Sequence, residues 1–255
     1  MEIGNYRGLR NRMAAEAVPL MRLETQPFIP ISFYMGEGDM RGAIQVSLTS
    51  DFICPWCLIG ERRLQVALAR LPGDVTVRMC WLPFQLNPTM PKEGLDRRAY
   101  RTAKFGSWER SQALDAQVAA AGRGDGIAFN HARMLRTPNT LAAHRLMRLA
   151  AREGDPTRLA DRLFAGYFIE GQNLSDNGRL AALAVEAGLP EASVQAVLGS
   201  DEYGDEVRAL EAEGRVAGIT GVPFFQIGEV AVYGAQSVDV LLDALKQAAR
   251  ATATS

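Results

Sequence analysis

The chain has 255 residues, 47% hydrophobic and 22% charged, which are ordinary values for a soluble globular protein. Its formal net charge of −1 gives no reason to expect nucleic acid or an anionic membrane as a partner. No stretch of the sequence approaches the roughly 20 apolar residues of a membrane-spanning helix. The segment Met13–Leu23 is interrupted by charges and a proline, so it predicts no secretory signal. With three cysteines in the chain, we expect a cytoplasmic protein whose thiols stay reduced.

The first third of the chain combines an irregular start with a β-α-β pattern. Residues 1–42 lack periodicity and carry several prolines and glycines, which predicts a flexible extension; the alternative is an extra strand or helix packed on the core. Ala43–Leu48 predicts a strand, and Leu58–Leu71 predicts a helix with an apolar stripe that stops at Pro72-Gly73. Val75–Leu82 alternates apolar residues and predicts a second strand. A β-α-β unit favours parallel strands.

The middle of the chain turns helical, and the pattern reverts to α and β near the end. A Gly228-Glu229 turn indicates a late hairpin, and Ser237 is placed to cap a last helix. The predicted order is β-α-β, a helical insertion, then α-β-β-α. The predicted helices are Leu95–Ala121, Thr137–Glu153, one starting at Asp155-Pro156, a run from Asp176 to Gly188, Glu191–Leu198, Glu202–Ala217 and Val238–Ala249, and the late strands are Pro223–Ile227 and Val230–Tyr233.

The motif Cys54-Pro55-Trp56-Cys57 holds two of the three cysteines at the start of the first predicted helix. Two thiols at this spacing can close into a small disulfide ring and open again, which indicates a redox-active rather than a structural cysteine pair. Backbone N–H groups and the helix macrodipole would favour a thiolate at Cys54, and Pro55 suits the first helical position. Cys57 falls on the apolar stripe. We therefore expect Cys54 to be the exposed nucleophile and Cys57 the shielded, resolving thiol.

Two other interpretations of the cysteines compete with redox chemistry. A CxxC pair is half of a zinc site, but Cys80 is the one further cysteine, and His131 and His144 lack the spacing of a zinc knuckle. We therefore predict no metal. The pair could also be purely structural, which proline between thiols at a helix start disfavours. Cys80 itself is predicted to be a small core residue.

Gly221-Val222-Pro223 precedes the predicted hairpin and is the second informative segment. A proline just before a strand is ordinarily an edge or turn device. The sharper interpretation is a cis peptide bond between Val222 and Pro223, which the residues alone do not establish because cis bonds are a small minority of X–Pro bonds.

Together these segments resemble the DsbA-like thiol–disulfide oxidoreductases, which elaborate the thioredoxin fold, and more narrowly their FrnE-type subgroup. The resemblance covers residues 43–250 and does not rest on CxxC alone. It rests on Ser50-Asp51-Phe52-Ile53-Cys54-Pro55-Trp56-Cys57 with Ile59-Gly60, on Pro83-Phe84-Gln85-Leu86-Asn87-Pro88, and on Asn139-Thr140 with Ala143-His144-Arg145.

The resemblance implies an α/β thioredoxin-like fold with a large all-helical insertion that caps the active site. Together with the sequence pattern, it leads us to expect a flexible extension over 1–42, a first thioredoxin-like part over 43–90, a helical insertion over 91–200, a second thioredoxin-like part over 201–250 and a tail over 251–255.

The family also implies a substrate cleft. Val222-Pro223 would be cis and face the two sulfurs, with the Val222 backbone bonding an incoming substrate chain in β fashion. Asn139, Thr140 and His144 would line the cleft, although His144 can equally be a packing or surface histidine.

Three residues of the active-site segment have expected roles, one of them with an open alternative. Asp51 could accept the proton of Cys57 during resolution, and the alternative is a loop or capping carboxylate. Trp56 is expected to be exposed and, with Pro55, to shape substrate contact.

The leading functional hypothesis is dithiol–disulfide exchange, as a reductase or isomerase, by a redox-active disulfide Cys54–Cys57 without other cofactor. One alternative is a glutathione-dependent transferase or isomerase of the kappa-class or 2-hydroxychromene-2-carboxylate isomerase type, whose relatives generally carry serine where this chain has Cys54. Another is a non-enzymatic redox-sensing or chaperone-like binding module. We expect a disulfide-containing protein or a small-molecule thiol or disulfide as substrate, a thiol reductant for recycling, and a monomer or homodimer.

Overall fold

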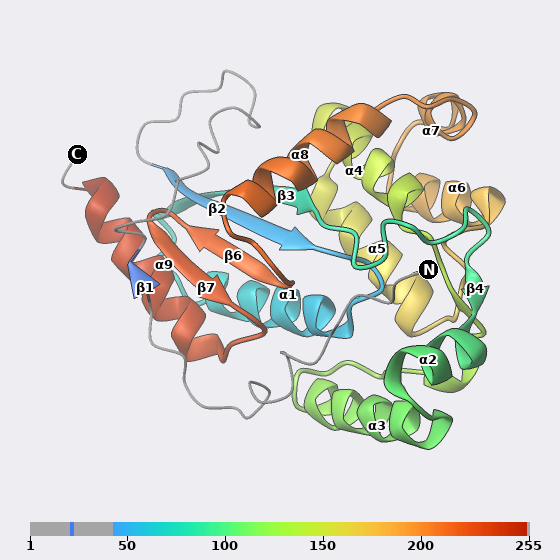
Figure 1. Ribbon diagram of the computed structural model, residues 1–255. Coiled ribbons are helices and arrows are strands. Elements are labelled where there is room, and N and C mark those ends of the chain that lie inside the picture. The colour runs from blue at the N-terminus through green and yellow to red at the C-terminus, as the bar shows by residue number, and fades with distance from the viewer. Residues whose placement is uncertain (1–20, 23–42, 254–255) are drawn as a thin grey trace.

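The computed structural model describes residues 21–22 and 43–253, and its strands form one mixed sheet (Figure 1). The strands are β1 (Met21–Arg22), β2 (Ala43–Ser50), β3 (Thr76–Pro83), β6 (Phe224–Ile227) and β7 (Val230–Tyr233). Their order across the sheet is β1-β7-β6-β2-β3. β2 runs parallel to β3, as the β-α-β pattern predicts, and antiparallel to β6, which forms the hairpin with β7.

Helices cover both faces of this sheet. α1 (Pro55–Leu68) and α9 (Val238–Ala253) lie together on one face, and α8 (Gly204–Val216) lies on the other (Figure 1). The apolar stripe of α1 is buried as predicted, with Cys57 and Leu64 exposing 0% and 1% of their surface. This α/β/α layering places the start of α1 at the end of β2, an internal strand between β6 and β3.

The rest of the described chain forms a helical region beside the sheet. Its elements are the helices α2 (Arg97–Phe105), α3 (Trp108–Gly124), α4 (Leu141–Glu153), α5 (Pro156–Phe168), α6 (Asn177–Glu186) and α7 (Glu191–Leu198), the short 3₁₀ turn His131–Arg133, and the two-residue strands β4 (Leu95–Asp96) and β5 (Arg136–Thr137). The predicted fold class, a thioredoxin-like α/β fold with a large helical insertion, is confirmed.

Several predicted helices have the wrong bounds: the one predicted over Leu58–Leu71 is α1, Pro55–Leu68, and the last one extends to Ala253 rather than Ala249. Two further differences change the course of the chain. The single helix predicted over Leu95–Ala121 is two helices, because Gly106 ends α2 with φ +93° and the Ser107 hydroxyl caps α3 by accepting the Arg110 N–H. The helix predicted from Thr137 begins at Leu141 instead. Residues 136–137 pair with 95–96 as a small ribbon, and the Asn139 side chain accepts the Leu141 N–H.

The ends of the chain are described only in part. β1 lies within residues 1–42 and pairs antiparallel with β7, so these two residues form the extra strand that was the alternative to a flexible extension. The same prediction for residues 1–20 and 23–42 lies outside the described residues. In the predicted tail 251–255, residues 251–253 continue α9, and residues 254–255 lie outside the described residues.

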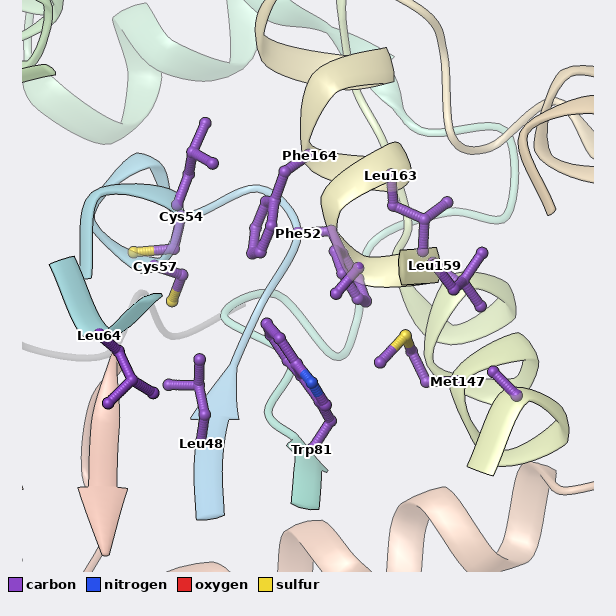
Figure 2. Packing of buried hydrophobic residues seen from close by; sticks show 14 of the residues in the cluster. Leu48, Phe52, Cys54, Cys57, Leu64, Trp81, Met147, Leu159, Leu163 and Phe164 are labelled. Carbon is purple, nitrogen blue, oxygen red and sulfur yellow. The ribbon is translucent and has the colours of Figure 1, made fainter. Parts of the chain in front are cut away.

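An aromatic cluster joins the sheet to the helical region beside the thiols (Figure 2). The ring of Phe164 on α5 lies 5.1 Å from that of Phe52, in the loop after β2, and 6.3 Å from that of Trp81 on β3. Trp81 also donates from Nε1 to the Thr157 hydroxyl at 3.1 Å. Full burial of one such ring contributes about 1.5–3 kcal/mol, so this cluster fixes the helical region over the thiol loop.

Candidate active site

The loop between β2 and α1 places both thiols at the helix start. Cys54 is the N-cap residue, with extended backbone angles, and Pro55 takes the first helical position as predicted. The Cys54 N–H donates to the Asp51 carbonyl at 3.0 Å, and the Cys57 N–H donates to the Cys54 carbonyl at 3.0 Å. Both residues are free thiols, and Figure 2 shows their sulfurs side by side at the head of α1.

The two thiols have opposite electrostatic environments. A hydrogen bond from the Cys57 side chain is the main reason why the pKa of Cys54 is lowered, and it outweighs the opposing effect of burial. The first-turn N–H groups of Cys57 and Trp56 lower it further, although no full capping hydrogen bond forms. Burial raises the pKa of Cys57 well above its usual value. The anion is therefore favoured on Cys54.

The structure corrects two predicted exposures. Cys54 was expected to be exposed but shows 7% of its surface, against 0% for Cys57, so only the ranking of the two thiols holds. Trp56 was also expected to be exposed, but it is half-buried and packs against the main core. Both corrections have the same cause: the helical region and the loop before β6 close over the first turn of α1, which sequence periodicity does not reveal.

The loop before β6 forms one wall of the site. The Val222–Pro223 peptide bond is cis, and the Cys54 thiol donates to the Val222 carbonyl oxygen with the two atoms 3.6 Å apart. Pro223 and Phe225 also pack against Gly60, where a Cβ atom would come within 3.0 Å of the Phe225 ring and 3.2 Å of the Pro223 ring. A glycine in α1 thus lets this loop approach the thiols.

Asp51 is fully buried beneath the thiols. Its Oδ2 accepts the Leu86 N–H at 2.7 Å, which ties the thiol loop to the segment after β3. Its Oδ1 lies 3.7 Å from Nε2 of His144 and has no hydrogen-bond partner among the described residues. The carboxylate also raises the pKa of both thiols by its charge. One oxygen therefore has the structural task of a loop carboxylate, and the other remains available.

The predicted cleft residues of the helical region lie near Asp51 but are largely enclosed. Asn139 donates from Nδ2 to the Met90 carbonyl at 2.7 Å, so its amide holds the backbone together. Thr140 exposes 4% of its surface at the start of α4. His144, one turn later, exposes 3% and is a buried histidine rather than a surface one.

Sequence reasoning missed a buried acid on α1. Glu61 exposes 1% of its surface, four residues after Cys57 on the same helix face. Burial, followed by the charge of Asp161, raises the pKa of Glu61 to about 7, so it carries a proton at neutral pH or just below. The available signal was its position: a carboxylate one turn after Cys57 on an apolar stripe is unusual.

Two further observations bear on the nature of the site. Within residues 43–253, no group of three or more histidine, cysteine or acidic side chains gathers as a metal ion would require. None of the helices in the described part of the chain is both long and apolar enough to cross a membrane. Cys80 is buried on β3 beside Leu82 and Leu210, as a small core residue would be.

The fold and the paired thiols at the head of α1 define the class of thioredoxin-fold proteins. Comparison of the sequence with protein families matches residues 45–246 to the DSBA-like thioredoxin domain. The Bacillus subtilis protein YwbO is 30% identical over 203 residues, which are 79% of this chain and 96% of that one. The chain therefore belongs to the DsbA-like thioredoxin domain family.

Solved structures agree with this assignment. The "probable DsbA oxidoreductase SCO1869" from Streptomyces coelicolor is 37% identical with a TM-score of 0.74, over 80% of this chain and 89% of that one. A 2-hydroxychromene-2-carboxylate isomerase has a TM-score of 0.63 at 15% identity, over 82% of this chain and 98% of that one. The second likeness shows a shared fold alone.

Proposed function

We propose that the protein is a dithiol–disulfide oxidoreductase in which Cys54 attacks and Cys57 resolves. The observation that carries this proposal is the opposite electrostatics of the two thiols: the pKa of Cys54 is lowered by its hydrogen bond from Cys57, whereas burial raises that of Cys57. A thiolate is the attacking species in disulfide exchange, and a protonated partner beside it is poised for the second step.

The reaction begins when the Cys54 thiolate attacks a disulfide of the substrate. A bond forms between Cys54 and one substrate sulfur, and the other substrate sulfur leaves as a thiolate. Cys57 then loses its proton and attacks Cys54, which releases the second substrate thiol and leaves the Cys54–Cys57 disulfide. The substrate gains two electrons, the enzyme loses two, and a thiol reductant returns them in recycling.

The surroundings of Cys54 support roles for several of the predicted site residues. The Val222 carbonyl, next to Pro223, lies 3.6 Å from the sulfur, where the backbone of this loop can meet an extended substrate chain. Asp51 is the proposed proton acceptor for Cys57, because its charge acts on both thiols and one of its oxygens has no hydrogen-bond partner among the described residues. Pro55 and half-buried Trp56 form the rim.

Reduction of insulin by dithiothreitol, followed as turbidity, tests the proposal. The wild-type protein should accelerate precipitation, Cys54→Ser should not, and Cys57→Ser should accumulate as a mixed disulfide that gel electrophoresis under non-reducing conditions reveals. Full activity of Cys57→Ser on a small electrophile with glutathione would instead indicate the transferase or isomerase. A wild-type protein without effect on insulin or on a small aromatic disulfide would contradict dithiol exchange.

We also propose that the reaction takes place in the cytoplasm, with a reductase or isomerase direction. The support is the cysteine content: three thiols, two of them in one motif, suit a compartment where thiols stay reduced. Cell fractionation with an antibody to the untagged full-length protein tests the location, and recovery from the periplasm or medium would contradict it.

A further inference from the structure

A buried histidine and a buried carboxylate face each other directly behind the thiol loop. Asp51 comes from the end of β2 and His144 from the first turn of α4, so the pair joins the sheet to the helical region. Asp51 exposes 0% and His144 3% of the side chain, and Oδ1 lies 3.7 Å from Nε2. Among the described residues, neither atom has a hydrogen-bond partner.

Buried polar atoms in proteins nearly always have a partner, so two orphaned atoms that face each other need an explanation. Packing does not provide it. The His144 ring lies 5.1 Å from the Phe52 ring, a contact that any aromatic side chain could make. The other Asp51 oxygen is already occupied by the Leu86 N–H. Oδ1 of Asp51 and Nε2 of His144 are therefore left to interact with each other, through a proton that one of the two atoms carries.

Other charged groups around the pair are engaged elsewhere or lack a charge. Arg148, on the same helix as His144, directs its guanidinium to Glu206, with Nε 2.8 Å from the carboxylate. Burial raises the pKa of Tyr167 on α5 far above neutrality, so it stays protonated. Among the described residues, Cys54 and Cys57 are further titratable groups on which the charge of Asp51 acts.

Asp51 is in direct contact with the resolving thiol. Its backbone hydrogen-bonds the Cys57 sulfur, and its charge raises the pKa of that thiol. His144 also lines a small pocket together with Ser50, Trp81 and Arg148. The volume of this pocket is about 10 Å³, about what one water molecule needs. The chain of groups therefore runs from the Cys57 thiol through Asp51 and His144 to a pocket.

We propose that His144 is the positioning residue that holds Asp51 ready to accept the proton of Cys57 during resolution. This inference rests on the proposed dithiol exchange and adds to it a residue from the helical region. Before the step, His144 faces the Asp51 carboxylate with its Nε2 proton and stabilises the charge. The helical insertion thus controls the second chemical step as well as covering the site.

The step balances as follows. The Cys57 S–H proton moves to the Asp51 carboxylate, and the freed electron pair forms the sulfur–sulfur bond to Cys54. The bond between Cys54 and the substrate sulfur breaks, and the substrate leaves as a thiolate that takes a proton from solvent. Asp51 then loses this proton to solvent while His144 keeps its own Nε2 proton, and the enzyme is left as the Cys54–Cys57 disulfide.

A single turnover with one equivalent of 5,5′-dithiobis(2-nitrobenzoate) separates the two steps. Attack by Cys54 releases the first coloured thiolate, and resolution by Cys57 releases the second. In the wild type, the rate of the second release should rise with pH and then reach a plateau, because a group of the enzyme is the base. A rise proportional to hydroxide through pH 9, without a plateau, would overturn the proposal without any variant.

His144→Gln should slow the second release at pH 7 by about tenfold, the effect of losing one contact to a charged group, and shift the plateau to a different pH. The first release should change less than about twofold. His131→Gln is the matched control, because His131 is the other histidine of the chain and also faces a carboxylate, Asp115, at 3.9 Å. It should leave both releases unchanged.

The double variant Asp51→Asn/His144→Gln decides whether the histidine acts through the carboxylate. It should resolve no more slowly than Asp51→Asn alone, because His144 has no separate role. If His144→Gln does not fold, His144→Asn replaces it in the same assays. An unchanged pH profile in a folded His144 variant would contradict the proposal and mean that Asp51 and His144 only pack the sheet against the helical region. Absence of the first release in the wild type would instead contradict the proposed function itself.

Discussion

The N-cap residue of α1 and the residues within the helix have pKa values shifted in opposite directions. At the N-cap, the pKa of Cys54 is lowered, chiefly by the hydrogen bond from the Cys57 side chain. Within the helix, burial raises the pKa of Cys57 and also that of Glu61, to about 7. Cys54 is itself buried, so burial alone does not decide the sign.

The difference between Cys54 and the two groups within the helix shows that hydrogen-bond donors, rather than solvent exposure, favour the anion at Cys54. N–H groups are unpaired in the first turn of a helix, whereas those of later turns are used by the helix itself. Cys80 shows the same rule on a strand, where burial raises its pKa to about 11. One short helix therefore favours the anion of the thiol at its N-cap and the neutral form of a carboxyl group two turns later.

The largest expected effect is selective alkylation of Cys54. With brief iodoacetamide treatment of the reduced protein, Cys54 should react much faster than Cys57, because the pKa of Cys54 is lowered and that of Cys57 is raised, so the thiolate forms on Cys54 first. The selectivity should persist at pH 6, because the pKa of Cys54 is lowered. Peptide mass spectrometry measures this selectivity. Comparable labelling of both thiols in the folded protein would contradict the opposite pKa shifts of Cys54 and Cys57.

The second effect concerns the stability contributed by Glu61. Its pKa is about 7 in the folded protein against 4.5 for an ordinary glutamate, so the folded state holds the proton more tightly. This stabilisation is complete below about pH 4.5 and is lost as the pH rises through 7, by about 3 kcal/mol in total.

Urea unfolding of Glu61→Gln, which cannot ionise, measures this effect. The free energy of unfolding of the variant, relative to wild type, should increase between pH 4.5 and 7 and stay constant above. Glu93→Gln, at an exposed carboxyl, is the matched control. A difference between Glu61→Gln and wild type that does not change with pH would mean that Glu61 is already ionised in the folded protein.

Much of this geometry could be predicted from the sequence, and the reasons can be traced to particular residues. The strand before Cys54, Pro55 at the first helical position and Cys57 on the apolar stripe follow from local periodicity and helix-start chemistry. The helical insertion follows from its helical pattern. The resemblance to a known family added the wall formed by Val222, far away in sequence.

What could not be predicted depends on contacts between distant segments. The burial of Cys54 and Trp56 requires the loop before β6 and the helical region to close over α1, which no local pattern encodes. Asp51 and His144 were each candidates, but the approach of Oδ1 and Nε2 to 3.7 Å depends on how α4 packs against the loop after β2. The break at Gly106 was missed because a single glycine inside a helical pattern is ordinarily tolerated.

A third effect separates the wall of the site from the thiols. In Gly60→Val, the new side chain would collide with the rings of Pro223 and Phe225, so the loop should shift away from Cys54 at a cost of about 1–3 kcal/mol. We expect slower reduction of insulin but retained selective alkylation of Cys54. Gly73→Val, where no atom lies within 4 Å of the added Cβ, is the control. Equal loss of both properties would mean that the wall also sets the thiol chemistry.

The smallest effect is expected at Cys80, the thiol with neither a helix start nor a neighbouring thiol. Its raised pKa of about 11 and its burial beside Leu82 and Leu210 leave it almost without thiolate at neutral pH. Cys80→Ser should therefore leave the rate of insulin reduction within about twofold of wild type, and native protein should resist labelling at this position until it is unfolded. Because Cys80 is as buried as Cys54, this variant isolates the contribution of the helix start and the second thiol. Rapid labelling of Cys80 in the folded protein would show that exposure by local opening, rather than donors at α1, governs which thiol reacts.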